Sequence, residues 1–254
     1  MRRAKHMNIK PWVKMPVEWI RDGRMKDNFA WKKGEGAAAI SALIIWITFV
    51  THSEEVKMRG IDLLKIDLTY DEIHHITSLS RKLVADGVSM LVDLALIVKE
   101  KRGTSNVYYI GGLEPGKWVM LPARALYDAS GTIHAFSAFN KRAVIELHAL
   151  KAYLYYAQAR DRVTGYTVAK YEKINEKTGI PEKRIHRANA TLLATRLLYD
   201  IDREKGTSTK THEPNKYYLI GYKDLFINKA TPPEPGISAP PKAAPSPPKL
   251  NDFL

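Results

Sequence analysis

The feature that most constrains this fold is an internal repeat, whose two copies are offset by 101 to 109 residues. The segment Trp12-Val13-Lys14-Met15-Pro16 recurs as Trp118-Val119-Met120-Leu121-Pro122. Three further matches follow in the same order: Ala42-Leu43 with Ala149-Leu150, Ile73 to Val84 with Ile174 to Ile185, and Asn106 to Tyr109 with Asn215 to Tyr218. Four matches in one order predict that the chain is two copies of a single unit.

Both copies contain the same expected order of elements, read from apolar periodicity and from turn and capping signals. In the first copy these are a buried helix over 37–50, a short helix from the capping box Thr69–Glu72 to Thr77, a turn over 78–80, a helix over 81–94, and strands over 96–98 and 106–110. In the second copy they are a helix with one apolar face (Ala143, Leu147, Leu150, Leu154, Ala157), a helix over 169–177, a turn over 178–180, a helix over 181–195, and strands over 197–201 and 216–220.

This order of helix, helix, tight turn, helix and two-stranded wing resembles the winged helix-turn-helix family. The resemblance covers about residues 10–225 and is carried by the segments 77–84 and 91–97 with their counterparts in the second copy. It implies an α+β fold, mainly α, of two tandem winged helices with small β-wings. The expected organisation is a basic arm over 1–10, a first domain over 11–112, a second over 113–230 and a proline-rich, disordered tail over 231–254.

The net charge of +13 favours polyanionic partners and is unevenly distributed. Residues 1–33 carry +7 and residues 112–230 carry +8, whereas residues 34–111 carry −2. The chain has no cysteine, so disulfides, zinc–thiolate sites and a cysteine nucleophile are excluded. Its most apolar stretch has 14 residues, fewer than the roughly 20 that span a bilayer, and no signal peptide is recognised, so we expect a cytoplasmic protein without membrane contact.

The second copy carries the stronger candidate DNA-binding surface. The resemblance implies that the helix over 181–195 lies in the major groove, with Ile185, Ala188 and Leu192 toward the core. Arginine can read guanine and asparagine can read adenine by paired hydrogen bonds. The candidate residues on or near the exposed face of this helix are Lys183, Arg184, His186, Arg187 and Asn189. In the second wing, Lys205, Lys210 and Lys216 are candidate phosphate contacts.

The first copy is the weaker candidate. Arg81 and Lys82 begin its helix, and Lys101 and Arg102 lie in its wing, but Ala85, Asp86 and Gly87 leave the helix largely apolar. Two alternatives stay open for this copy: it reads DNA, or it provides a dimer or partner surface.

Catalytic chemistry is not indicated by the sequence, and we expect no enzyme activity, no cofactor and no metal. A phosphate loop of the form G-x-x-x-x-G-K-[ST] is absent. Tyr153, Tyr155 and Tyr156 raise the possibility of a DNA-nicking tyrosine, but the His-apolar-His metal pair of such enzymes is absent. These tyrosines and His148 are therefore expected to pack in the core.

Tandem winged helices joined by a long helix resemble the plasmid-type replication initiators, which bind double-stranded DNA at origin repeats without catalysis. The resemblance implies association with plasmid or nucleoid, and the terminal residues Leu250–Leu254 vaguely resemble peptides that dock on host replication proteins. One alternative is a transcription regulator that binds an inverted repeat as a dimer with a second copy. Another is an adaptor whose winged helices bind protein.

Overall fold

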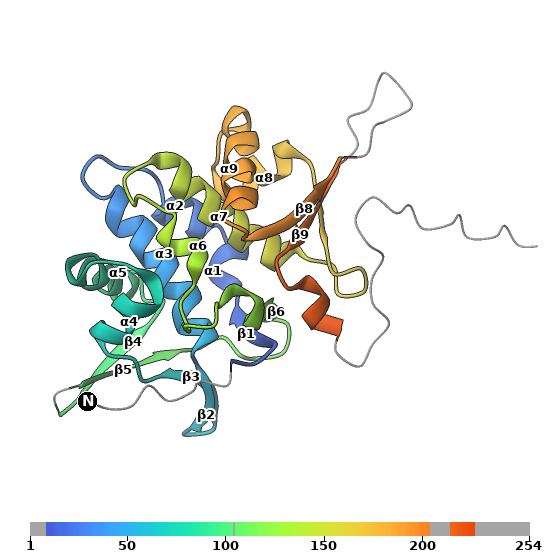
Figure 1. The fold of residues 1–254 in the computed structure, drawn as a ribbon. Coiled ribbons are helices and arrows are strands. Elements are labelled where there is room, and N and C mark those ends of the chain that lie inside the picture. Colours follow the sequence, from blue (N-terminus) through green and yellow to red (C-terminus); the bar gives the residue numbers. More distant parts are fainter. Residues whose placement is uncertain (1–8, 104, 204–213, 227–254) are drawn as a thin grey trace, which may run out of the picture.

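The computed structural model describes residues 9–103, 105–203 and 214–226, and the statements below concern those residues (Figure 1). The chain forms an α+β fold with small antiparallel sheets, as predicted in this coarser form. Within the described ranges, no helix has both the length and the apolar character needed to cross a membrane. The basic arm and the proline-rich tail fall almost wholly outside the described residues.

The first half contains ten elements, and the second half repeats most of them. The first half runs β1 (Trp12–Pro16), α1 (Glu18–Arg21), α2 (Arg24–Asn28), α3 (Gly36–Thr51), β2 (Glu54–Met58), β3 (Ile61–Ile66), α4 (Tyr70–Thr77), α5 (Arg81–Asp93), β4 (Val98–Arg102) and β5 (Ser105–Ile110). The second runs β6 (Trp118–Pro122), the 3-10 helix η1 (Arg124–Leu126), α6 (His134–Ser137), α7 (Val144–Ala159), β7 (Thr167–Ala169), α8 (Tyr171–Thr178), α9 (Glu182–Ala194), β8 (Leu198–Asp202), β9 (Asn215–Leu219) and the 3-10 helix η2 (Tyr222–Phe226).

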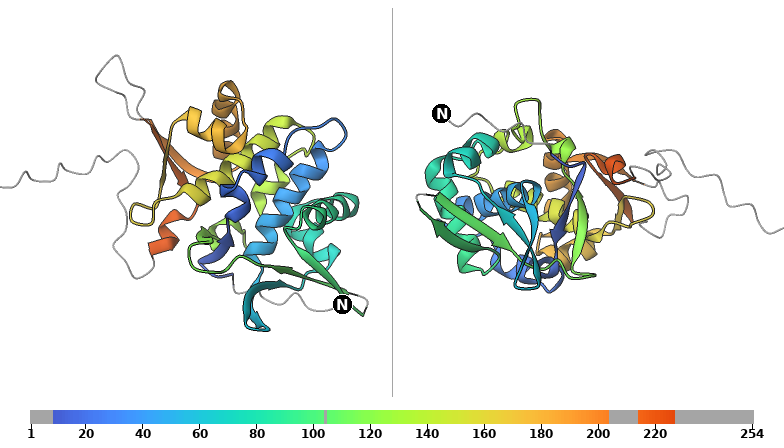
Figure 2. Two further views of the ribbon diagram at one scale, coloured as in Figure 1. Left: turned by 180° about the vertical axis from the view of Figure 1, so that it is seen from behind. Right: turned by 90° about the horizontal axis from the view of Figure 1, so that it is seen from below.

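The repeated Trp-Val-x-x-Pro segments form one antiparallel ribbon, β1 with β6, visible in the right-hand view of Figure 2. The pairing is centred on Lys14 opposite Met120, so the first residue of each repeated segment pairs with the last residue of the other. The flanking bonds follow the same rule: the amide of Ala123 donates to the Pro11 carbonyl and the amide of Val17 to the Lys117 carbonyl, both at 2.9 Å. A local twofold therefore relates the two copies at this ribbon.

The repeat also extends to single hydrogen bonds at the turns between α4 and α5 and between α8 and α9. Thr77 and Thr178 each donate a side-chain bond of 2.6 Å to the carbonyl four residues earlier. Each threonine hydroxyl then accepts the amide two residues later, at 3.2 Å. The next residues, Ser78 and Gly179, both adopt a left-handed conformation, with φ of 56° and 69°. The same tight turn thus precedes α5 and α9.

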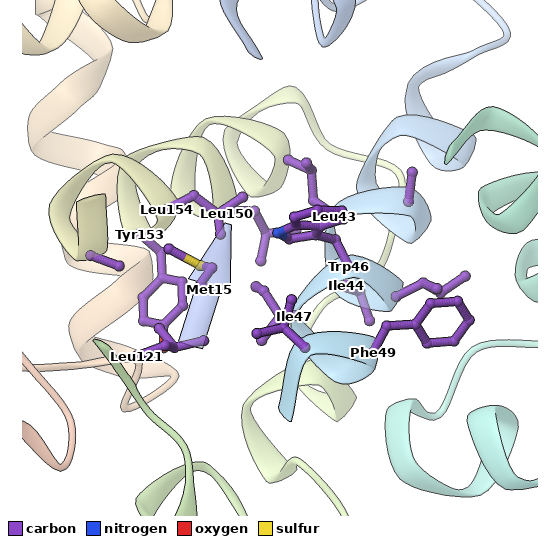
Figure 3. Close-up of a cluster of buried hydrophobic side chains, with 14 of the residues drawn as sticks. Met15, Leu43, Ile44, Trp46, Ile47, Phe49, Leu121, Leu150, Tyr153 and Leu154 are labelled. Atoms are coloured by element: carbon purple, nitrogen blue, oxygen red, sulfur yellow. The ribbon is translucent and has the colours of Figure 1, made fainter. Parts of the chain in front are cut away.

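The hydrophobic core is continuous through both halves. Its centre lies between α3 and α7, where Trp46 and Tyr153 occupy equivalent repeat positions and are at most 1% exposed (Figure 3). Around them, equivalent ring pairs stabilise each half: Phe49 contacts Tyr108 with ring centroids 4.6 Å apart, and Tyr156 stacks on Tyr217 at 4.1 Å. The predicted domain limits at 112 and 113 stay a prediction, because the two copies share this core.

The prediction that the first long helix of the second copy has a single apolar face is wrong. This helix is α7, and it is buried on all sides from Glu146 to Ala157. It packs against α8, α9 and β9 of its own half and against α1 and α3 of the other. Some of its polar side chains form hydrogen bonds there. The Glu146 carboxylate, for example, accepts the amides of Arg142 and Ala143 at 3.0 Å.

Two other details differ from the sequence-based expectations. The first wing strand is β4 at Val98–Arg102, whereas the sequence predicted a strand over 96–98, and β5 begins at Ser105, one residue before its predicted start. Residues 111–117 between the halves contain no helix and lead directly into β6, and the long helix α7 lies within the second half. The halves are joined instead by the β1–β6 ribbon and by the packing of α3 on α7.

Candidate nucleic-acid interface

The α9 helix presents a basic face because its apolar residues recur at helical spacing. Ile185, Ala188 and Leu192 are fully buried, as predicted. The remaining positions of the first two turns lie outside, and the basic residues among them are exposed: Lys183, Arg184, His186 and Arg187. The face thus combines three permanent positive charges with one imidazole.

These cations of α9 are not neutralised by ion pairs in the described part of the chain. Among the described residues, no carboxylate forms an ion pair with Lys183, Arg184 or Arg187. Exposed ion pairs elsewhere, such as Lys173 with Glu176 at 2.6 Å, show that acidic partners are used on the neighbouring helix α8. Unpaired guanidinium and ammonium groups on one helix face are well suited to bind phosphate oxygens and guanine.

The expectation that Asn189 lies on or near this face is wrong. Asn189 is 2% exposed, and its Oδ1 accepts a hydrogen bond from the Tyr156 hydroxyl at 2.7 Å. The position follows Ala188 on the inner side of α9, where α9 packs against α7. Asn189 therefore belongs to the core and is not available to read a base.

The equivalent face of the first copy is less basic. Arg81 and Lys82 are exposed at the start of α5, but the Arg81 guanidinium forms an ion pair with Asp71. Further along, α5 approaches α3 closely at Gly87, where a Cβ would come within 2.9 Å of the Ala42 backbone nitrogen. This helix serves mainly to pack against α3.

The wing residues are placed only in part. In the first wing, Lys101 and Arg102 are exposed on β4, and the Arg102 guanidinium donates to the Tyr109 hydroxyl at 2.8 Å. In the second, Lys216 is the second residue of β9, and its ammonium lies 3.7 Å from the Asp202 carboxylate. Lys205 and Lys210 lie outside the described residues.

The tyrosines and the histidine of α7 are buried, as predicted. Tyr153, Tyr155 and Tyr156 are at most 5% exposed, and burial raises the pKa of each phenol. His148 is 8% exposed, and its pKa is lowered to about 4, mainly by burial and in addition by the charges of Lys151 and Arg184. In the described part of the chain, no group of three or more His, Asp or Glu side chains is arranged to hold a metal ion.

Sequence reasoning missed Lys26 and Lys151, which lie beside the start of α9. Lys151 is 3% exposed within α7, and its ammonium donates to the Phe29 carbonyl at 3.0 Å. The signal available in the sequence was a lysine one position after the apolar pair Ala149-Leu150, inside a mostly apolar helix.

Comparison of the chain with protein-family models, with curated proteins and with solved structures finds no match. Its function is therefore inferred from the chemistry of its surfaces.

Proposed function

We propose that this protein binds double-stranded DNA through tandem winged helices and acts as a replication initiator of the plasmid or phage type. The observation that carries the proposal is the unpaired basic face of α9, made of Lys183, Arg184, His186 and Arg187, on the second helix of a helix–turn–helix. A helix in this position lies in the major groove in proteins of that architecture. The residues at its start are the ones that reach base edges.

The two copies support an asymmetric DNA site read by one chain. The β1–β6 ribbon relates them by a local twofold, and the shared core holds the helix pairs α4–α5 and α8–α9 within one chain. The exposed residues of α5 and α9 differ, since α9 has three unpaired cations and Arg81 on α5 is neutralised by Asp71. Such a chain fits an asymmetric DNA site. An origin with direct repeats contains several copies of such a site. It would act on plasmid or nucleoid DNA without catalysis.

The test is sequencing of the DNA that the full chain retains from sheared genomic and plasmid DNA of the source organism at low salt. Direct repeats beside an AT-rich stretch are the expected result. Retention of one inverted repeat over a promoter would instead identify a dimeric regulator. If no DNA is retained at low salt, DNA binding is wrong, and the adaptor that binds protein becomes the better hypothesis.

A further inference from the structure

A pocket of about 460 Å³ lies where the first half meets the start of α9. It is bordered by α2 and the segment after it, by α7, and by the turn before α9. Its lining residues are Lys26, Phe29, Ala30, Trp31, Val144, His148, Lys151, Gly179, Pro181 and Arg184. Three of them are cations and one is a histidine, and no acidic residue lines the pocket.

The buried ammonium of Lys151 is the central feature of the pocket. An ammonium has three N–H donors, and the Phe29 carbonyl accepts only one of them. Among the described residues, no carboxylate lies within ion-pair distance of Lys151. Burial lowers its pKa to about 8; the charge of Asp27 opposes this shift and that of Lys26 adds to it. Buried charges are normally paired, because an isolated one is costly to remove from water.

His148 is the second polar group of the pocket without a complete set of partners. It is more than nine-tenths buried, and its Nδ1 has no hydrogen-bond partner within the described residues. Because its pKa is about 4, the ring is neutral at pH 7 and carries one N–H donor. The positive charges of Lys151 and Arg184 act on this ring and favour an anion beside it.

The wall next to α9 is shaped by a contact between the two halves. A Cβ on Gly179 would lie 3.0 Å from Lys26 Cγ, so the Lys26 stem packs against the turn before α9. Pro181 precedes this helix without a side-chain cap. The positive end of the helix dipole therefore adds to the field of Lys26 and Arg184.

We propose that this pocket binds a single phosphoryl group, supplied either by the DNA backbone or by a small phosphorylated molecule. Three cations from three separate elements match the negative charge and several acceptor oxygens of a phosphate group better than they match the two oxygens of a carboxylate. Bound there, the group would contact α2 of the first half and α7 and α9 of the second. The inference does not depend on DNA binding, because the small molecule is a sufficient source.

The test uses inorganic phosphate as the probe, titrated against the full chain at constant ionic strength with chloride, with amide NMR shifts as the readout. Saturable shifts at Gly179, Glu182 and Lys183 are expected, with at least a tenfold loss of affinity in Lys26→Gln. Lys57→Gln on exposed β2 removes the same charge far from the pocket and should bind like the parent. Lys151→Met, which keeps an apolar stem, should abolish binding if the variant folds.

Shifts no larger than those from chloride would overturn the proposal, as would equal affinity in Lys26→Gln and the parent. The source is decided by DNA titrations. If the DNA backbone supplies the phosphate, Lys26→Gln weakens binding to all DNA sequences alike. It also lowers by about one the slope of the logarithm of the binding constant against the logarithm of the salt concentration. If a small molecule supplies it, DNA affinity is unchanged and the DNA-bound protein still takes up phosphate. Phosphate binding without any DNA binding would contradict only the proposed function.

Discussion

The hydroxyl of Tyr156 on α7 donates to Oδ1 of Asn189 on α9 at 2.7 Å, and both side chains are at most 2% exposed. This bond adds one polar contact to the packing of α9 on α7, in which Ile185, Ala188 and Leu192 are fully buried. The burial of those three residues leaves Lys183, His186 and Arg187 facing outward. A residue type suited to reading adenine serves here in the packing of the helix that carries the basic face.

Replacement of Asn189 by Ala should reduce the free energy of unfolding by about 1–3 kcal/mol, because the buried Tyr156 hydroxyl loses its acceptor. Base preference should stay that of the parent. Urea unfolding measures the first effect and binding to a panel of mutated sites the second. Tyr156→Phe provides the matched control, since combining it with Asn189→Ala should cost less than the sum of the two. Unchanged stability with altered base preference would contradict the buried position.

Replacement of Gly87 by Ala should destabilise the protein although it improves helix propensity. The new Cβ would lie 2.9 Å from backbone atoms of Ser41 and Ala42 on α3, which cannot move aside as a flexible side chain can. Overpacking of this kind costs about 1–3 kcal/mol, against a gain of about 1 kcal/mol in helix propensity. Ser89→Ala, on the exposed side of the same helix, should change the midpoint of urea unfolding very little. A more stable Gly87→Ala would show that α3 and α5 are further apart.

The sequence predicted the elements whose pattern is local. The capping box of Thr69 and Glu72 is confirmed, since each side chain accepts the amide of the other residue's backbone. The helices α4, α5, α8 and α9 end within about two residues of their predicted limits, because turns and caps fix them. The inward positions of Ile185 and Leu192 followed from spacing alone.

Much of what the sequence did not predict depends on contacts between the halves. The strand β1 pairs only with β6, more than 100 residues away, so neither strand has a local signal beyond its repeat. Lys151 is buried because α7 is enclosed by both halves. Asn189 is buried by the packing of α9 on α7 within the second half, although the spacing of the apolar residues of α9 had placed it near the outer face. The pocket beside α9 is formed by α2 and α7 together, so only the assembled fold brings Lys26 to Lys151.

The partly buried His52 should make stability depend on pH below neutrality. Burial lowers its pKa to about 4, against the opposing effects of the Thr48 carbonyl and the Glu72 charge. In the unfolded chain the histidine ring takes up a proton near pH 6.5. The contribution of neutral His52 to stability is therefore complete at pH 7 and is lost as the pH falls toward 4. When the pH falls from 7 to 5, the free energy of unfolding should decrease by about 1–2 kcal/mol less in His52→Gln than in the parent.

Urea unfolding at several pH values measures this difference. His148, whose pKa is also lowered to about 4, should contribute a similar dependence, so the slope should fall further in the double variant with His148→Gln. His75→Gln, at an exposed position of α4, is the control and should follow the parent at every pH. A parent-like pH profile for His52→Gln would mean that the ring is solvated.

The assignment of α9 as the reading helix is tested most directly at Arg187. This side chain is exposed and has no partner on the described protein, so Arg187→Ala should leave the midpoint of urea unfolding unchanged. Loss of a guanine contact should cost about 1–3 kcal/mol in binding to the preferred site and relax specificity at one base pair. Arg162→Ala removes the same charge from the exposed loop after α7 and should cause a smaller loss that is equal for all sequences. Fluorescence anisotropy titrations with the preferred and mutated DNA sites at fixed salt concentration make the comparison. If both variants lose the same affinity for every sequence, α9 contacts phosphates and does not read bases.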